Sequence, residues 1–310
     1  MILLYGIAGL LLIVVLVGMA YQMLFTLIDR QRYKTPPGEM IDIGSHRLHI
    51  RIMGDAPGLT VVLDAGVGGN NLDWQRVQQE VGKFARVVSY DRGGYGWSEK
   101  GPDPRTPERI VEELHLLLNR AGITPPYIMV GHSFGGIYVR LFARKYPDEV
   151  AGFIFVESSH PDMLKAVNTE PELKRLRRVM IFKRLGIVRA MLPRLMSHAK
   201  VLDRTARKQY LAINMLDTDN VIREAKPMYE SGVDLPETID LPLTVISRER
   251  FDELPAEKRW QEYQDRLVAL SADAKRIYTS TSSHYTALVE PDPVVSAIRD
   301  MVAQTIDNSV

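Results

Sequence analysis

Hydrophobic and polar positions divide the chain into three regions with different patterns. Apolar residues are nearly continuous from residue 2 to residue 28, and this stretch contains no charged residue. In residues 38–159 and 239–310, short apolar runs alternate with segments of helical spacing, whereas residues 160–238 have helical periodicity and little sign of strands. The pattern predicts an apolar helix (1–28), a linker over residues 29–37, and an alternating core split by a helical insertion.

The alternating regions predict a mostly parallel α/β sheet. Buried apolar strands that follow one another through helices require helices on both faces of such a sheet. Thr106 and Pro107 form a typical helix start, and Gly44-Ser45 joins the first two strands as a hairpin. The expected strands are 40–43, 48–53, 60–65, 87–90, 127–130, 150–156, 243–247 and 276–279. The expected helices of the core are 74–81, 107–121, 136–146 and 292–305.

The apolar segment 2–28 is long enough to cross a bilayer, because about 20 apolar residues span the hydrocarbon core as a helix. A cleaved signal peptide has a basic start and a shorter apolar run, but no Lys or Arg precedes this one. We therefore expect a single-pass membrane anchor, with a buried core helix as the alternative. Arg30, Arg32 and Lys34 follow the segment, so the positive-inside rule favours a cytoplasmic position for the remainder of the chain.

Composition narrows the possible functions. The 310 residues include 39 basic and 38 acidic side chains and no cysteine. This balance argues against a dedicated nucleic-acid binder. The lack of cysteine excludes a thiol nucleophile, a disulfide framework and a cysteine-ligated zinc. No histidine pair has a ligand-like spacing with carboxylates, so we expect no metal.

The segment Gly131-His132-Ser133-Phe134-Gly135 lies between an expected strand and an expected helix. A serine on such a sharp turn has its hydroxyl forced outward, at the positive end of the helix dipole. The flanking glycines fit a turn in which backbone segments approach too closely for a Cβ atom. The pattern predicts that Ser133 is a nucleophile; a glycine-rich turn without chemistry is the alternative.

With this turn, the alternation and the insertion, residues 38–305 resemble the α/β-hydrolase family. Tyr90-Asp91-Arg92-Gly93-Gly94-Tyr95-Gly96-Trp97-Ser98 resembles the loop after the family's fourth strand, and Gly131–Gly136 resembles its nucleophile turn. The resemblance implies that residues 160–238 form a helical lid and that a triad follows in the order serine, acid, histidine. Dehalogenases and epoxide hydrolases of this fold need a carboxylate nucleophile at the position of Ser133, which disfavours those reactions.

The resemblance also indicates the partners of Ser133. His284 follows the last expected strand, where the family carries its general base. The acid usually follows the strand expected at 243–247, where Asp252 or Glu249 could serve. We favour Glu157, directly after the strand at 150–156, as in some haloalkane dehalogenases, because a carboxylate at the end of an apolar strand is costly to bury unless paired.

An oxyanion hole needs two backbone amides. The resemblance assigns them to Phe134 and to Val67, the latter in the Gly66–Gly69 loop; a plain glycine turn is the alternative. We expect His132 at the pocket floor and His160 at the edge of the lid, both as substrate contacts.

These features predict a membrane-anchored serine hydrolase that cleaves an ester-like bond of a small or lipid-like substrate without a cofactor. A ligand-binding receptor, a pseudo-enzyme, a carbon–carbon bond hydrolase and a cofactor-free haloperoxidase remain open alternatives. Residues 173–208 carry twelve basic side chains and one acid, Asp203. This pattern fits a basic amphipathic surface on anionic headgroups, and equally a solvated face.

Overall fold

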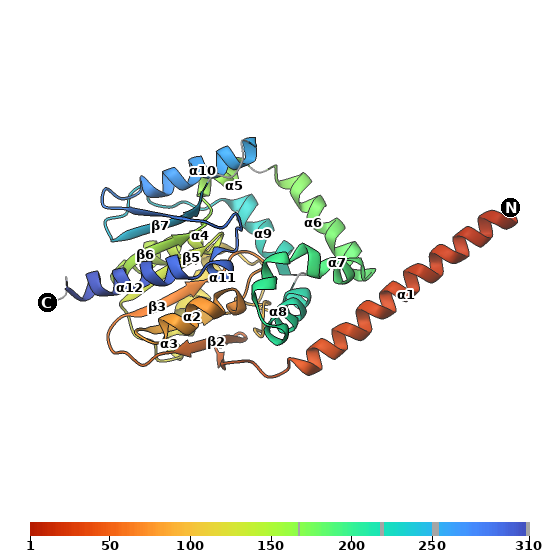
Figure 1. Ribbon diagram of the computed structural model, residues 1–310, viewed down its shortest axis with the longest axis horizontal. Coiled ribbons are helices and arrows are strands. Elements are labelled where there is room, and N and C mark those ends of the chain that lie inside the picture. The colour runs from red at the N-terminus through yellow and green to blue at the C-terminus, as the bar shows by residue number, and fades with distance from the viewer. Residues whose placement is uncertain (167, 218–219, 250–253, 308–310) are drawn as a thin grey trace.

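The computed structural model describes residues 1–310 except 167, 218–219, 250–253 and 308–310. An eight-stranded sheet in the order β1-β2-β4-β3-β5-β6-β7-β8 forms its centre (Figure 1). The first two strands are antiparallel to their neighbours, and the other pairs are parallel. The strands are β1 (Glu39–Asp42), β2 (Arg47–Met53), β3 (Thr60–Asp64), β4 (Arg86–Tyr90), β5 (Tyr127–His132), β6 (Val150–Val156), β7 (Leu243–Arg248) and β8 (Lys275–Thr279).

Helices cover both faces of this sheet, as the strand pattern predicts. On one face, Leu114 of α3 and Phe142 of α4 share a core with Val62. On the other face, Val77 of α2 and Ile298 of α12 share a core with Val61, the neighbour of Val62 in β3. The core helices are α2 (Gln75–Val81), α3 (Pro107–Arg120), α4 (Gly135–Lys145), α10 (Pro255–Val268), α11 (Thr286–Val289) and α12 (Asp292–Asp307), with 3-10 turns η1 (Asn71–Trp74) and η2 (Pro147–Glu149).

The predicted strands and the four predicted core helices are confirmed, with small differences at their ends. The Thr106 hydroxyl accepts a hydrogen bond from the Arg109 amide (3.3 Å) and caps α3. Helix α10 was not predicted from the apolar pattern. Its buried residues in the described structure are Gln264 and Leu267, although Trp260, Tyr263, Leu267 and Val268 are at helical spacing in the sequence.

Helices connect β6 to β7 in the described part of residues 160–238. Ring contacts join this insertion to the turn after β5: Tyr229 lies 6.0 Å from Phe134, ring centre to ring centre. The insertion therefore lies at the carboxyl end of the central strands. Figure 1 shows two of its helices, α8 (Arg204–Asp217) and α9 (Asn220–Ser231), on this side of the sheet. Its elements are α5 (Pro161–Ala166), α6 (Thr169–Arg184), α7 (Ile187–Leu195), η3 (Ser197–Val201), α8 (Arg204–Asp217) and α9 (Asn220–Ser231).

The apolar N-terminus is a single helix, α1 (Ile2–Arg32), whose first half projects away from the rest of the molecule (Figure 1). It continues four residues beyond residue 28 and is long and apolar enough to cross a membrane. Its side chains from Leu3 to Val17 are all exposed. A soluble core helix would bury such residues, and this helix does not.

Candidate active site

Ser133 stands on a strained turn between β5 and α4. Its φ of 52° is in the left-handed region, which non-glycine residues rarely adopt. A Cβ on Gly131 would lie 2.6 Å from Gly136 Cα, and one on Gly135 would collide with the Asp64 carbonyl. The two glycines therefore permit the tight approach of β5, α4 and β3 that lifts the serine out of the sheet.

Glu157 directly follows β6 and has the same unusual backbone conformation. Within the described ranges, Ser133 and Glu157 (φ 47°) are the only non-glycine residues with a positive φ. Such conformations cost about 1–3 kcal/mol each and persist where the surrounding structure imposes them, most often at functional sites. The two strained residues directly follow adjacent strands, β5 and β6, and the Ser133 amide donates to the carbonyl of Val156 (3.3 Å).

The structure brings Glu157 and His284 together. His284 Nδ1 lies 3.4 Å from Oε2 of Glu157, whose carboxylate is fully buried. Trp260 Nε1 donates to the same oxygen (3.1 Å), and the Arg248 amide donates to Oε1 (2.7 Å). The Arg248 guanidinium also pairs with Oε2. Burial of this carboxylate is thus compensated by four donors.

Two of the residues that supply these donors, Arg248 and Trp260, were not anticipated from the sequence. Trp260 also meets the His284 ring edge to face, with centres 5.3 Å apart. They lie 91 and 103 residues from Glu157 in the chain, so no local pattern reports the contact. The one available signal was that Arg248 ends the strand beside the one that Glu157 follows.

Glu157 and His284 are in contact, but the Ser133 hydroxyl does not reach either of them. In the described part of the chain, the Ser133 hydroxyl has no hydrogen-bond partner. Catalytic hydrogen bonds are often long before substrate binds and tighten in the substrate complex. A carboxylate on Nδ1 leaves Nε2 as the ring nitrogen that can accept a proton.

Two backbone amides beside Ser133 are unpaired. The N–H groups of Val67 and Phe134 have no hydrogen-bond acceptor among the described residues. The loop after β3 approaches the serine closely, because a Cβ on Gly66 would lie 2.9 Å from Ser133 Cβ and 3.4 Å from its Oγ. Unpaired amides next to a nucleophile can stabilise an oxyanion.

Arg92 holds this loop in place. Its Nη1 donates to the Ala65 carbonyl (2.7 Å) and its Nη2 to the Gly66 carbonyl (2.6 Å). The same buried guanidinium pairs with Asp64 (2.6 Å) and with Glu224 of α9 (3.0 Å). Burial raises the pKa of Asp64 to about 6, although Arg92 acts in the opposite direction.

Asp91 has a different set of partners. It accepts hydrogen bonds from His49 Nδ1 (2.7 Å), the Asn71 amide (2.7 Å) and the Trp97 amide (3.0 Å). Asp91 and Arg92 therefore stabilise the loop after β4 through separate sets of partners.

His132 holds the backbone of His284. Its Nε2–H donates to the carbonyl oxygen of His284 (2.8 Å). Burial, with a smaller effect of the neighbouring His284, lowers the pKa of His132 to about 3, so the ring is neutral. It lines a space of about 10 Å³ with Asp73, Trp74 and Tyr285, which is too small for a substrate.

His160 lines a separate cavity of about 570 Å³ with Arg140, Lys165 and Arg266. Its Nδ1 accepts a hydrogen bond from the Asp162 amide (3.2 Å) at the start of α5. Burial lowers the pKa of His160 to about 4. The substrate contacts predicted for His132 and His160 remain predictions.

Of the alternative acids, Asp252 lies outside the described residues. Glu249 is exposed, and its amide donates to the carbonyl of Thr279 (3.3 Å). The described residues contain no group of three or more His, Asp or Glu side chains that could hold a metal ion.

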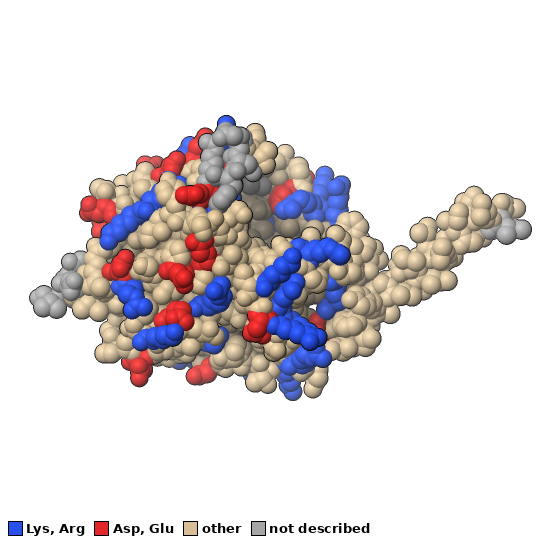
Figure 2. Space-filling view, in the orientation of Figure 1, with Lys and Arg blue, Asp and Glu red and all other residues tan. Residues whose placement is uncertain are grey.

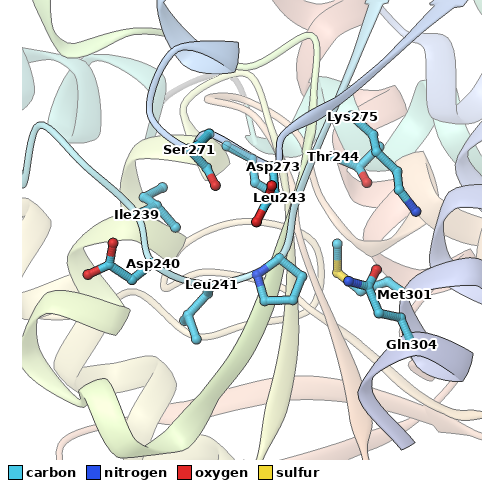
Figure 3. A pocket seen from close by; sticks show the side chains of 12 residues that line it. Ile239, Asp240, Leu241, Leu243, Thr244, Ser271, Asp273, Lys275, Met301 and Gln304 are labelled. Atoms are coloured by element: carbon cyan, nitrogen blue, oxygen red, sulfur yellow. The ribbon is translucent and has the colours of Figure 1, made fainter. Parts of the chain in front are cut away.

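A cavity of about 360 Å³ lies at the opposite end of the sheet. Figure 3 shows the side chains that line it. Its lining includes Thr244 and Lys275 at the starts of β7 and β8, with Asp273 from the preceding loop. Ser133 follows the end of the parallel strand β5. This cavity therefore does not belong to the site around Ser133.

A model of the α/β-hydrolase fold family matches residues 60–192, the stretch that contains Ser133 and Glu157. An esterase from Thermogutta terrifontis has the same fold, with a TM-score of 0.67 and 24% identity over 87% of this chain and 99% of the esterase. The chain has the α/β-hydrolase fold. The family model and the solved structures support the family that the motifs indicated.

Other proteins similar to this chain differ in what is known of them. The uncharacterised protein YqjL of Bacillus subtilis is 26% identical over 79% of this chain and 83% of its own length. A variant of an epoxide hydrolase from Bacillus megaterium superposes with a TM-score of 0.69, at 16% identity over 86% of this chain and 100% of the other. Solved structures at these identities establish the fold, and the reaction must be argued from the site.

Proposed function

We propose that this chain is a membrane-anchored serine hydrolase that cleaves an ester-like bond through an acyl-enzyme. The observation that carries the proposal is the pair of strained residues that follow adjacent strands, Ser133 and Glu157, with His284 in contact with Glu157. The strained backbone at Ser133 and Glu157 supports their roles as the serine and the acid of a Ser–acid–His triad.

In this mechanism, Ser133 Oγ attacks the carbonyl carbon while His284 Nε2 takes the hydroxyl proton. Glu157 holds Nδ1–H and stabilises the imidazolium that forms. The unpaired amides of Val67 and Phe134 donate to the oxyanion of the tetrahedral intermediate. That intermediate collapses, the C–O bond breaks, and His284 protonates the departing alcohol. Water, deprotonated by His284, then releases the acid and restores Ser133.

The nucleophile separates this reaction from others on the same fold. Epoxide and haloalkane hydrolysis in the family use a carboxylate where this chain has Ser133. The two unpaired amides beside it favour a reaction with an oxyanion, such as acyl transfer, over displacement at a saturated carbon. Every catalytic part is supplied by the protein, so the mechanism requires no cofactor.

We further propose that α1 anchors the hydrolase in a membrane. Its apolar side chains from Leu3 to Val17 are all exposed in the described structure, which favours lipid as their environment. Arg30, Arg32 and Lys34 follow directly, so the proposed orientation places the hydrolase domain in the cytoplasm. A small acyl-type or lipid-like substrate suits this location.

Turnover of p-nitrophenyl esters of short and long acyl chains tests the proposal. We expect a burst of nitrophenolate equal to the enzyme concentration, followed by slower steady release, because acylation precedes deacylation. Ser133→Ala should abolish the burst while the thermal unfolding midpoint is retained. Absence of burst and turnover in the folded wild type would instead favour a ligand-binding protein on this fold.

A further inference from the structure

Helix α1 is not a free tether, because its second half is docked on the helical insertion. Gly18 lies against the Leu185 carbonyl so closely that any Cβ would collide with it. Asp29 accepts a hydrogen bond from Arg189 of α7 (2.6 Å), and both side chains are buried. Arg189 Nε also donates to Gln22 (3.2 Å). The segment from Gly18 to Asp29 is therefore fixed to α6 and α7.

This docking leaves too little free helix to cross a bilayer. Only the side chains from Leu3 to Val17 are uniformly exposed, and this stretch is about 22 Å long at about 1.5 Å per residue. The hydrocarbon core is about 30 Å thick. If α1 spans the membrane without leaving its dock, the hydrocarbon must reach roughly five residues further, to about the level of Gln22.

The turn between α6 and α7 lies at that level. A Cβ on Gly186 would be 2.8 Å from the carbonyl oxygen of Gly18 and 3.0 Å from the Tyr21 ring. Large apolar side chains around this turn are 42% to 59% exposed. They are Ile181, Phe182, Ile187, Met191 and Leu195.

Basic side chains flank this apolar group. Within α6 and α7, exposed positions include Lys174, Arg177, Arg178, Arg184 and Arg194. Figure 2 shows Lys and Arg gathered on the flank of the molecule from which α1 projects. Exposed apolar side chains with basic neighbours are typical of a helix that lies in a membrane interface with anionic lipids.

We infer that the α6–α7 turn lies in the headgroup region of the bilayer that α1 crosses. Phe182, Ile187 and their apolar neighbours enter the boundary of the acyl chains, while the arginines pair with lipid phosphates. The inference rests on the proposed membrane span of α1 and adds a second contact to it. Two contacts fix how the insertion, and with it the site, is held against the membrane.

Depth measurements on the full chain test this inference. The chain contains no cysteine, so a single introduced thiol is a unique attachment point for a fluorophore. Phe182→Cys and Met191→Cys report on the turn, and Leu11→Cys reports on the span. Leu116→Cys, at an exposed apolar position of α3, is the matched control.

Each labelled chain is reconstituted in phosphatidylcholine–phosphatidylserine vesicles with lipid quenchers at a shallow or a deep acyl position, and iodide serves as the aqueous quencher. We expect several-fold stronger shallow-lipid quenching at 182 and 191 than at 116, with the reverse order for iodide.

Labels at 182 and 191 that behave like the label at 116, while the label at 11 is quenched by deep lipid, would overturn the inference and leave the span intact. A label at 11 quenched by iodide would overturn the span itself, and the inference with it. Unchanged near-ultraviolet circular dichroism verifies the fold of each variant.

Discussion

At the scale of single residues, the carboxylate of Glu157 has two tasks. It compensates the charge of Arg248, and it offers one oxygen to His284 at 3.4 Å. A hydrogen bond of that length is weak at rest. It gains strength when His284 becomes positively charged, because charge-assisted bonds are shorter and stronger. In the proposed mechanism, Arg248 and Trp260 hold Glu157 in place for the step in which His284 takes the serine proton.

Replacing Glu157 separates the two candidate acids. We expect Glu157→Gln to lower kcat by roughly 10³- to 10⁴-fold, because an amide in place of the carboxylate favours the wrong histidine tautomer. Asp252→Asn is the matched variant and should leave kcat unchanged. Steady-state ester hydrolysis measures both. Full activity in Glu157→Gln, with loss in Asp252→Asn, would reverse the assignment.

His132 makes stability depend on pH. Its pKa is about 3 in the folded protein, because of burial, and 6.5 when unfolded. Between these values the unfolded chain binds more protons, so stability is complete above pH 6.5 and falls as the pH decreases. We expect the free energy of unfolding to lose on the order of 2 kcal/mol through His132 between pH 6.5 and pH 5.

Denaturant unfolding in detergent at several pH values measures this slope. His132→Gln retains a donor for the His284 carbonyl but cannot be protonated. Its free energy of unfolding should therefore change less steeply with pH than that of the wild type, by an amount that corresponds to at most one bound proton. Other buried acids and histidines contribute equally to both proteins and cancel in the difference. Parallel slopes would mean that His132 is not held neutral by the fold.

At the scale of elements, one buried arginine connects the insertion to the loop beside Ser133. Arg92 joins Glu224 of α9 to the carbonyls of Ala65 and Gly66, directly before Val67. The position of the Val67 amide therefore depends on a helix inserted more than 100 residues later in the chain. Tyr138 of α4 also donates to Glu224 (2.9 Å), so three elements meet at one carboxylate.

Glu224→Gln tests this connection. Loss of one buried charge from the cluster should destabilise the fold by about 1–3 kcal/mol and lower kcat by weakening the hold on the oxyanion loop. Glu230→Gln, on the same helix and in an exposed pair with Lys226, should cost less than about 0.5 kcal/mol. Thermal unfolding and ester turnover distinguish them; equal effects would show that the buried pair has no special role.

The same elements explain what could be predicted from the sequence. The turn around Ser133 was recognisable because its glycines and its position between strand and helix are local features. The contact of Glu157 with His284 followed from strand order in a known family. Arg248 and Trp260 could not be found, since they lie 91 and 103 residues from Glu157 and meet it only through the placement of β7 and α10 in space. The pairing of Arg92 with Glu224 likewise needed the placement of the insertion in space.

At the scale of the whole molecule, the proposed membrane location depends on one apolar helix, α1. A lysine in the middle of a membrane-spanning helix costs about 2.5–3.5 kcal/mol. We therefore expect Leu11→Lys combined with Val14→Lys to shift the chain from the membrane pellet to the supernatant after alkaline carbonate extraction. Leu116→Lys on α3 is the control and should remain in the pellet with the wild type. A wild-type chain found mainly in the supernatant would contradict the anchor.

The identity of the nucleophile is the central claim, and covalent trapping tests it most directly. The full chain is treated with a fluorophosphonate, and intact-mass and peptide mass spectrometry locate the adduct. We predict one adduct per chain, on Ser133, which is absent in Ser133→Ala and retained in Ser197→Ala, a variant at an exposed serine of the insertion. A folded wild-type chain that remains unlabelled, or that is labelled equally after Ser133→Ala, would contradict the account.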